Sequence, residues 1–368
     1  MIYSEDILNF FKKKKINFFC GVPDSVLKNF TNILSNKKNI KNIITHNEGG
    51  AVALAAGYHL KTKKIPVVYL QNSGLSNAIN PLTSLTHKKV YSIPICLFIG
   101  WRGAPNIKDE PQHQVKGKIT KEILKLLNIK YCILEKKGDL LKLNKLINLS
   151  NKTNKPIACL IKNNKIKSKE EKKFGKIKEF DENKYSRFKI IKYIAKYKNI
   201  KIFSTTGYTS RELYKIRKDN NFNKIDFYNI GAMGHLSMIA LGYTINNKQK
   251  NVICLDGDGS FLMHLGFTSM VNSHKNFKHI IFNNGVHESV GNQKTNINNI
   301  ELKKFSKSVG YKNYFYADNF NLFKNKFDLF LKKNGPSLFE IKVPTGTLKN
   351  IPRPNNFKLI KNNFIKFK

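Results

Sequence analysis

Several kinds of residue and pattern are scarce in this chain of 368 residues, and each absence excludes a class of protein. The five cysteines lie far apart and form no CxxC pair, which disfavours a zinc site or a disulfide framework. They predict buried thiols in the reducing cytoplasm. No apolar run approaches the roughly 18 residues of a membrane span. The start of the chain has acidic residues where a secretory signal has a basic end.

Acidic residues are also few, with 24 Asp and Glu against 66 Lys and Arg and a formal net charge of +42. The lysines are spread along the whole chain and accompany asparagine and isoleucine, as in LKLNKLINLSNKTNK, which is typical of a general compositional bias. Arginine is scarce, and no zinc-finger, RNP or homeodomain-like pattern occurs. Solvated lysine faces are therefore favoured over specific nucleic-acid binding. A non-catalytic basic protein that binds nucleic acid stays open as an alternative.

Patterns of buried strands and helices alternate in both halves of the chain. Strands are expected at 42–46, 66–70, 95–100, 200–204, 251–255, 279–283 and 337–343. Helices are expected at 49–61, 210–218, 235–245 and 261–274. This alternation predicts an α/β fold with two doubly wound parallel sheets.

The same patterns divide the chain into parts. A hydrophobic fraction of 41% and the recurring apolar runs indicate a globular protein long enough for two domains, which we place at 1–165 and 185–345. Residues 166–184 lose apolar periodicity and are expected to be a linker. The Pro-rich segment 346–368 is expected to be a tail over the surface.

Polar side chains follow two of the expected strands at the point where each strand ends. Asp258 comes after the strand at 251–255, and Asn284 comes after the next strand, 26 residues later. Because ligands bind beyond the carboxyl ends of strands in an open α/β sheet, we expect these side chains to emerge side by side. Carboxylate, amide and carbonyl oxygens, completed by phosphate oxygens, form an octahedral magnesium site.

The residues around Asp258 fit a bound diphosphate. Gly257 and Gly259 permit a tight turn, and a helix beginning near Ser260 offers amide donors to a phosphate. A dinucleotide fingerprint would need a third glycine where Leu262 stands. An ordinary strand-to-helix turn capped by an aspartate is the other alternative, and the asparagine at the matching strand end argues against it.

GDGS at 257–260, followed 26 residues later by the second Asn of NN, resembles the signature of the thiamine-diphosphate-dependent decarboxylase superfamily. The resemblance implies that Asp258, Asn284 and the carbonyl of Val286 hold Mg²⁺. THNEGGAVALAAGY carries Glu48, which is implied to hydrogen-bond the aminopyrimidine ring of the cofactor and to activate it.

Two more stretches extend this resemblance. NIGAMGHLSMIALG implies that the Gly231 carbonyl meets the amino group of the cofactor and that Met233 supports its bent shape. STTGYTSREL resembles a loop that contacts the diphosphate. The residues implied to bind the diphosphate side of the cofactor are Gly207, Tyr208, Thr209, Gly257, Asp258, Gly259, Ser260 and Asn284.

The order and spacing of these motifs narrow the family. Glu48 precedes Asp258 by 210 residues, which leaves no room for a middle domain, and the pyrimidine-binding half precedes the diphosphate-binding half. The chain therefore resembles the compact two-domain decarboxylases of 3-substituted pyruvates, and the likeness covers most of its length. It implies conversion of 3-phosphonopyruvate to phosphonoacetaldehyde and CO₂ in phosphonate biosynthesis. Sulfopyruvate or another 3-substituted pyruvate is the alternative substrate.

A substrate with a carboxylate and a second anionic group needs cations around it. The segment WRGAPNIKDEPQHQVKG supplies Arg102, Lys108 and His113 as candidates, and GVPDSVLK adds Asp24 and Ser25. The resemblance makes His113 and His287 the candidate proton donors beside Glu48. It also implies that the chain associates with itself, with the active site at the subunit interface. From its composition and apolar runs we expect that it binds neither a membrane nor a specific nucleic acid.

Overall fold

The computed structural model describes residues 1–34, 37, 39–169, 184–197, 200–220, 225–245, 250–272 and 274–366. The chain forms two compact units, one of residues 1–174 with 290–293 and one of residues 175–289 with 294–368. Most of the linker expected at 166–184 lies outside the described residues. Residues 166–169 and 184 of it are described, and Ile166–Lys167 form β8, which pairs in parallel with β1 (Ile2–Tyr3). No described helix is long and apolar enough to cross a membrane.

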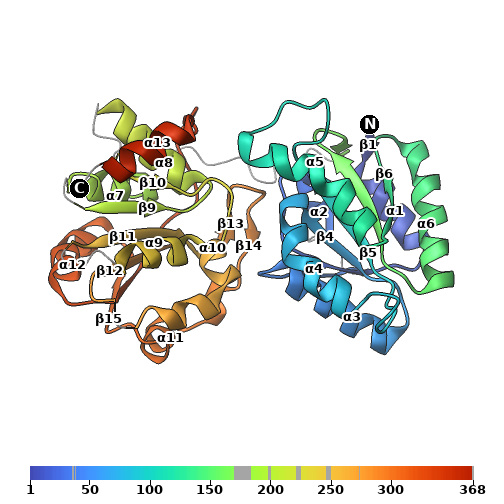
Figure 1. Ribbon diagram of the computed structural model, residues 1–368, viewed down its shortest axis with the longest axis horizontal. Coiled ribbons are helices and arrows are strands. Elements are labelled where there is room, and N and C mark those ends of the chain that lie inside the picture. Colours follow the sequence, from blue (N-terminus) through green and yellow to red (C-terminus); the bar gives the residue numbers. More distant parts are fainter. Residues whose placement is uncertain are drawn as a thin grey trace. The chain divides into compact units, whose positions relative to one another are not determined.

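The first unit is built on a six-stranded sheet in the order β3-β2-β4-β5-β7-β6, with every pair parallel (Figure 1). The central strands are buried apolar runs, as expected for a parallel sheet covered on both faces. The strands are β2 (Phe18–Gly21), β3 (Lys41–Ile44), β4 (Val67–Gln71), β5 (Cys96–Trp101), β6 (Lys130–Ile133) and β7 (Ile157–Lys162).

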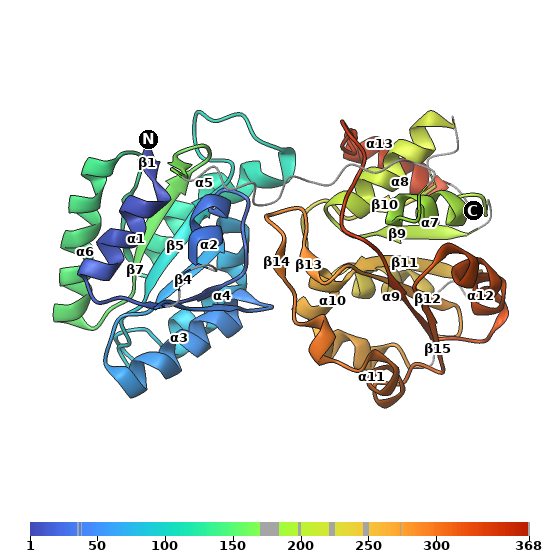
Figure 2. The ribbon, with the colours of Figure 1, turned by 180° about the vertical axis from the view of Figure 1, so that it is seen from behind.

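Helices cover both faces of this sheet (Figures 1 and 2). The hydrophobic core on one face is formed with α1 (Ser4–Lys13), α2 (Lys28–Leu34) and α6 (Leu140–Thr153). The core on the other face is formed with α3 (Glu48–Thr62), α4 (Leu75–Ser84) and α5 (Pro111–Leu126). Short 3₁₀ turns precede α4 and α6, namely η1 (Asn72–Gly74) and η2 (Lys137–Asp139).

The second unit has a parallel six-stranded sheet of the same topology, in the order β10-β9-β11-β12-β16-β15. In both units the strand order, numbered along the chain, is 2-1-3-4-6-5, so the two halves repeat one architecture. The expectation of two doubly wound parallel sheets is therefore confirmed. The strands are β9 (Lys201–Ser204), β10 (Phe227–Tyr228), β11 (Val252–Gly257), β12 (Phe277–Asn283), β15 (Asn313–Ala317) and β16 (Ser337–Lys342).

The helices of the second unit are also divided between two faces. One core includes α7 (Arg187–Ile194), α8 (Tyr208–Asp219) and α12 (Phe320–Lys332). The other includes α9 (Leu236–Thr244), α10 (Asp258–Met263), α11 (Leu302–Ser308) and α13 (Phe357–Lys366). The remaining elements of this part of the chain are η3 (Leu265–Met270), β13 (Val286–His287), β14 (Gln293–Lys294) and η4 (Ile297–Asn299).

Two local expectations for this part of the chain differ from the structure. A single helix at 261–274 is wrong: α10 ends at Met263, and His264 leaves the helical conformation (φ −138°, ψ 59°) before η3. The C-terminal segment is more than a surface tail, because it contains α13. Phe364 of this helix is buried against the rings of Phe203, Phe227 and Tyr243, which anchors the segment to the sheet.

Candidate functional site

Asp258 is the first residue of α10, directly after the carboxyl end of β11. Its side chain is buried, and Oδ1 accepts a hydrogen bond from Gly259 N at 2.8 Å. Oδ2 accepts from Gly285 N at 2.7 Å and from Thr295 Oγ1 at 3.0 Å. Burial raises the pKa of Asp258 to about 6, although these hydrogen bonds act against it. Among the described residues no basic side chain hydrogen-bonds to this carboxylate, so a buried cation would relieve the cost of its charge.

Asn284 follows the carboxyl end of β12, the strand that pairs in parallel with β11. The Gly285 N–H that binds Asp258 joins the two strand ends, so the structure brings Asp258 and Asn284 together. Asn284 Oδ1 accepts from Val286 N at 3.1 Å, and the Val286 carbonyl accepts from Glu288 N at 3.0 Å. Carboxylate, amide and carbonyl oxygens are hard donors that suit Mg²⁺, so the residues present fit this ion.

Three segments that carry candidate diphosphate ligands are held together by the hydroxyl of Ser260. This hydroxyl lies 2.9 Å from Thr205 Oγ1, just beyond β9, and accepts from Gly234 N at 3.1 Å, in the loop before α9. Gly207 precedes α8, and Tyr208 and Thr209 are its first residues. The ends of β9 and β11 and the loop before α9 therefore meet at Ser260.

The loop before α9 contains the residues expected to face the cofactor ring. Gly231 is exposed and Met233 is half-buried, and the Gly231 carbonyl accepts from Met233 N at 2.6 Å in a tight turn. Asn229 supports this turn, since its Nδ2 donates to Ala232 O at 2.8 Å. Sequence reasoning gave no role to Asn229, although it is the first residue of the motif NIGAMGHLSMIALG.

A buried ionic network contacts Asn284, and the sequence analysis did not predict it. Arg187 donates to both oxygens of Glu212 (2.9 and 2.8 Å) and to Glu288 Oε2 (2.8 Å). Glu288 Oε2 in turn accepts from Asn284 Nδ2 at 3.2 Å. Opposing effects act on Arg187, since burial lowers its pKa and the two glutamates raise it, with a net increase. No local pattern reveals this network, because Arg187 and Glu288 are 101 residues apart.

The C-terminal segment closes this network. The Gly346 N–H donates to Glu288 Oε1, and Thr347 Oγ1 donates to Glu212 Oε1 at 3.0 Å. Tyr208 lies against the Arg187 guanidinium, with 5.7 Å from Cζ to the ring centroid. The network therefore links the start of α8, the candidate metal ligand Asn284 and the segment after β16.

His287 lies on β13, and its imidazole packs against the backbone of Gly259. A Cβ at position 259 would come within 2.7 Å of this ring, so only glycine leaves room for it. The contact places His287 beside the start of α10, next to Asp258.

Glu48, on the first unit, is the first residue of α3. Asn47 caps the helix by accepting from Gly49 N at 2.8 Å, which is the preferred chemistry at a helix N-terminus. The Glu48 side chain is buried, and burial raises its pKa while Asn77, which donates to Oε2 at 2.8 Å, lowers it in part. A Cβ on Gly74 would come within 2.0 Å of Glu48 Oε1, so glycine is required there.

Arg102 lies just beyond the end of β5 and is held on several sides. Its guanidinium binds both oxygens of Asp109 and donates to Ser25 Oγ at 3.1 Å. Burial raises the pKa of Asp109, but the hydrogen bonds from Arg102 and the backbone and the charge of Arg102 outweigh it and lower the pKa overall. Asn72 of η1 binds the backbone N–H and carbonyl of Arg102, which links it to the turn beside Glu48.

The other candidates on the first unit differ in their surroundings. Asp24 is buried, and its Oδ2 accepts from Val26 N and Leu27 N, as a capping residue does. Its other oxygen has no hydrogen-bond partner among the described residues, and burial raises its pKa to about 6. Lys108 is exposed, and His113 is half-buried in the first turn of α5.

Two family models match the chain. Residues 1–123 match the thiamine pyrophosphate enzyme N-terminal TPP binding domain, and residues 205–341 match the C-terminal TPP binding domain. The chain therefore belongs to the thiamine pyrophosphate (thiamine diphosphate) enzymes. The expectations of a thiamine diphosphate cofactor with Mg²⁺, and of a pyrimidine-binding domain followed by a diphosphate-binding domain, are confirmed.

The relatives narrow the class to decarboxylases. The chain is 28% identical over 371 aligned residues to phosphonopyruvate decarboxylase of Streptomyces viridochromogenes, covering 96% of this chain and 91% of that protein. It is 29% identical to the same enzyme of Streptomyces hygroscopicus over 96% of this chain and 90% of that protein. It is 33% identical over 147 residues to the sulfopyruvate decarboxylase subunit beta of Methanothermobacter thermautotrophicus, covering 39% of this chain and 74% of that subunit. The chain is thus a thiamine-diphosphate-dependent carboxy-lyase.

Proposed function

We propose that this enzyme decarboxylates 3-phosphonopyruvate to phosphonoacetaldehyde and CO₂ without oxidation. The observation that carries the proposal is that two phosphonopyruvate decarboxylases match nearly the whole chain, across both units. In the reaction the bond between the carboxylate and the keto carbon breaks, CO₂ leaves, and a proton takes its place on carbon. The reaction would be a step of phosphonate biosynthesis.

The residues of the second unit would hold the cofactor by its diphosphate. Asp258, Asn284 and the Val286 carbonyl would bind Mg²⁺, while Gly207, Tyr208, Thr209, Gly257, Gly259 and Ser260 would surround the diphosphate. On the other side of the cofactor, the Gly231 carbonyl and Met233 would face its ring. The cofactor, when bound, supplies an electron sink for the electrons left by departing CO₂.

Glu48 would bind the aminopyrimidine ring through its carboxyl group. Because burial raises its pKa, this group holds a proton more readily than an exposed glutamate and can share it with a ring nitrogen. Gly74 leaves the carboxyl group its space, and Asn77 orients it. The arrangement suits a group that must move a proton at one defined atom.

Arg102 would bind an anionic group of the substrate. Asp109 and Ser25 hold its guanidinium in one orientation, so little side-chain freedom is lost when a phosphonate binds. Lys108 and Asp24 lie on the flanking segments and would complete this part of the pocket. His113 and His287 are the groups that would deliver the product proton.

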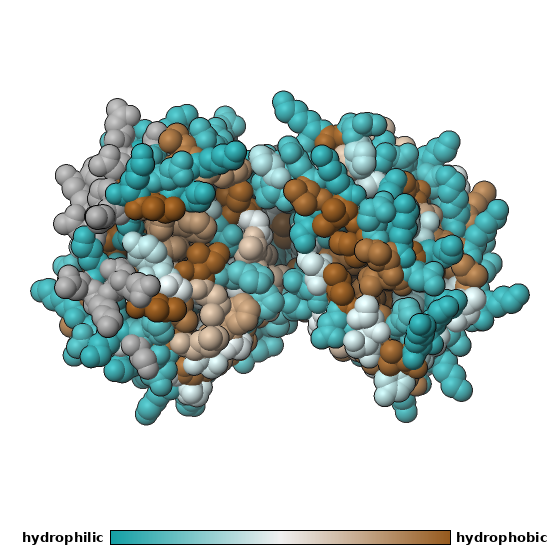
Figure 3. All heavy atoms as spheres, viewed as in Figure 1, coloured by the Kyte–Doolittle hydropathy of each residue, from teal (hydrophilic) through white to brown (hydrophobic). Residues whose placement is uncertain are grey.

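The enzyme would work as a self-associating protein with its active site at the subunit interface. Exposed apolar side chains gather on the helices that follow Glu48 and Arg102, which favours burial by another subunit. They are Leu54 and Leu60 of α3, Ile79 of α4, and Val115, Ile119 and Leu126 of α5. Figure 3 shows such hydrophobic patches among the hydrophilic residues. All five cysteines are free and buried, which suits the cytoplasm.

Sulfopyruvate is the second candidate substrate. The match to sulfopyruvate decarboxylase subunits favours it, and a sulfonate resembles a phosphonate in size and shape but carries less negative charge. The test supplies purified protein with thiamine diphosphate, Mg²⁺ and either acid, and measures aldehyde formation. We expect kcat/KM to be highest with phosphonopyruvate. Turnover of sulfopyruvate alone would overturn the proposal, and turnover of neither would overturn both candidates.

A further inference from the structure

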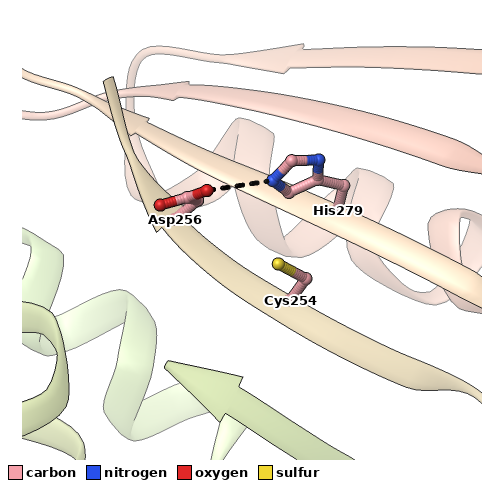
Figure 4. Close-up of side chains that lie close together, drawn as sticks. All are labelled: Cys254, Asp256 and His279. Carbon is pink, nitrogen blue, oxygen red and sulfur yellow. Dashed lines mark ion pairs between the residues drawn. The ribbon is translucent and has the colours of Figure 1, made fainter. Parts of the chain in front are cut away.

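Three buried side chains in the second unit have no part in the chemistry described above. Cys254 and Asp256 lie two residues apart on β11 and so face the same side of the sheet, and His279 stands opposite Cys254 on β12. The Cys254 sulfur, an Asp256 oxygen and a His279 ring nitrogen all lie within 4.8 Å of one another. Figure 4 shows the three side chains pointing toward a common centre. Each is at most 1% exposed.

One ring nitrogen of His279, Nε2, faces the Asp256 carboxylate across this cluster (Figure 4). His279 Nδ1 lies 2.7 Å from the hydroxyl of buried Tyr311, which fixes the ring. His279 Nε2 has no hydrogen-bond partner in the described part of the chain, and Asp256 Oδ2, at 3.6 Å, is too far for a hydrogen bond. A buried polar atom without a hydrogen-bond partner costs free energy. A bound group that contacts both His279 Nε2 and Asp256 Oδ2 would therefore stabilise the cluster.

We propose that Cys254, Asp256 and His279 bind a transition-metal ion, with zinc as the natural occupant. Sulfur, imidazole nitrogen and carboxylate oxygen are the three ligand types that zinc takes in proteins. Around tetrahedral zinc, a nitrogen and an oxygen ligand are separated by about 3.4 Å, close to the 3.6 Å between His279 Nε2 and Asp256 Oδ2. The sulfur needs to move inward by about 1.2 Å at most.

Surrounding groups support this assignment. A zinc-bound histidine usually has a partner on its other nitrogen, and Tyr311 occupies that place on His279. The second oxygen of Asp256 accepts from Gly257 N at 3.0 Å, which orients the carboxylate. The fourth coordination position is available to one water or to this second oxygen.

In the metal-free protein Cys254 is a thiol, because burial and the nearby Asp256 raise its pKa well above the usual value. A bound cation reverses this effect by stabilising the thiolate, and the thiol proton is released on binding. The ion would fasten β11 to β12 a few residues before Asp258 and Asn284. Its role would therefore be to fix the register of the two strand ends that form the magnesium site. The buried position requires the metal to enter during folding.

The first measurement is the metal content of the full-length protein, purified without chelators from medium that contains zinc. We expect about one zinc per chain by elemental mass spectrometry. Protein expressed in cobalt-supplemented medium should show thiolate-to-cobalt charge-transfer absorption, which a cobalt ion in the oxygen-only magnesium site cannot produce. The cobalt spectrum needs no variant and stays informative if substitutions in the core prevent folding.

Variants distinguish metal bound by this cluster from metal bound at other sites. Cys254→Ser should remove most of the zinc and the charge-transfer absorption. Cys96→Ser is the matched control, because Cys96 is equally buried in a central strand of the other sheet, and it should keep both. Asp258→Ala removes a magnesium ligand and should also keep both. Absence of zinc and of the absorption in the unaltered protein would show a purely polar core cluster and overturn the proposal. Loss of zinc in Asp258→Ala but not in Cys254→Ser would assign the metal to the magnesium site and overturn it as well.

Discussion

At the scale of single residues, the environment of a carboxyl group decides what it can do. Glu48 and Asp258 are both buried carboxyl groups with raised pKa values, yet the groups around them differ. Glu48 accepts a side-chain hydrogen bond from an amide and is placed to exchange a proton. Asp258 accepts three hydrogen bonds at its two oxygens and is placed to hold a cation. We therefore expect Glu48 to affect kcat and Asp258 to affect Mg²⁺ binding.

Replacement of Glu48 by glutamine should lower kcat by about 10²–10⁴-fold, because an amide cannot share a proton with the cofactor ring. Affinity for thiamine diphosphate and the melting temperature should change little, since the amide fills the same space and still accepts from Asn77. Steady-state kinetics and cofactor titration check this. Glu122→Gln, at an exposed position, is the control. A Glu48→Gln variant with unaltered kcat would show that Glu48 has no part in proton transfer.

The affinity for Mg²⁺ should depend on pH through Asp258. Burial raises its pKa to about 6 from the ordinary 3.8, so in the cofactor-free protein its ionisation costs stability as the pH rises from about 4 to 6. Mg²⁺ binds the ionised form, so its affinity should fall about tenfold per pH unit below pH 6 and stay level above it.

The measurement is the Mg²⁺ dissociation constant at saturating cofactor, corrected for protonation of the free cofactor. Asp24→Asn is a matched control, because Asp24 also has a pKa raised to about 6 by burial but lies on the other unit. This variant should keep the slope. A dissociation constant that stays level down to pH 5 would contradict the assignment of Asp258 as the metal ligand.

At the scale of elements, strand ends and a buried ionic network together position the side chains that we propose as metal ligands. β11 and β12 deliver Asp258 and Asn284 to one edge of the sheet. The orientation of the Asn284 amide depends on Glu288, which is itself held by Arg187 and by the Gly346 N–H. We therefore expect Glu288 to be a positioning residue for the proposed metal site.

Replacement of Glu288 by glutamine should weaken Mg²⁺ binding at saturating cofactor by about 10–100-fold, as for other groups that orient metal ligands. Arg187 keeps its two hydrogen bonds to Glu212, so the free energy of unfolding should fall by only about 1–2 kcal/mol. Calorimetric titration and thermal melting measure the two effects. Glu301→Gln, at an exposed ion pair of the same unit, should change neither. Unchanged Mg²⁺ affinity in Glu288→Gln would exclude the positioning role.

At the scale of the whole molecule, two units with one topology carry different parts of the proposed active site. Glu48 and Arg102 lie on the first unit, and the proposed magnesium ligands lie on the second. An active site shared between subunits would combine the first unit of one chain with the second unit of another. Mixed assemblies of two inactive variants test this arrangement.

Chains with Glu48→Gln and chains with Asp258→Ala should each be inactive alone and should regain activity when they are coexpressed. In a dimer with shared sites, one of the two sites of a mixed dimer contains neither substitution. Random pairing then restores about a quarter of the activity of the unaltered enzyme. A chain that carries both substitutions, coexpressed with an Asp258→Ala chain, is the inactive control. No recovery in the mixture would place each active site within a single chain.

The meeting of Asp258 and Asn284 at one edge of the second sheet could be predicted because its parts are local in the sequence. Asp258 and Asn284 each follow an apolar strand, and parallel strands deliver their carboxyl ends to the same edge. The Arg187 network could not be predicted, because its members meet only after the chain has folded. The break at His264 and the burial of Phe364 also depend on packing, which no local period reveals.

The sequence by itself determined the alternation of strands and helices, the two-unit organisation and the order of the cofactor motifs, since these follow from local apolar periods and short spacings. Only the tertiary structure decided which charged groups are buried together and which polar atoms are left without partners. Burial makes a charge or a lone pair depend on neighbours from distant parts of the chain. Cys254, Asp256 and His279 are ordinary strand residues in the sequence and form a cluster only where β11 and β12 pair.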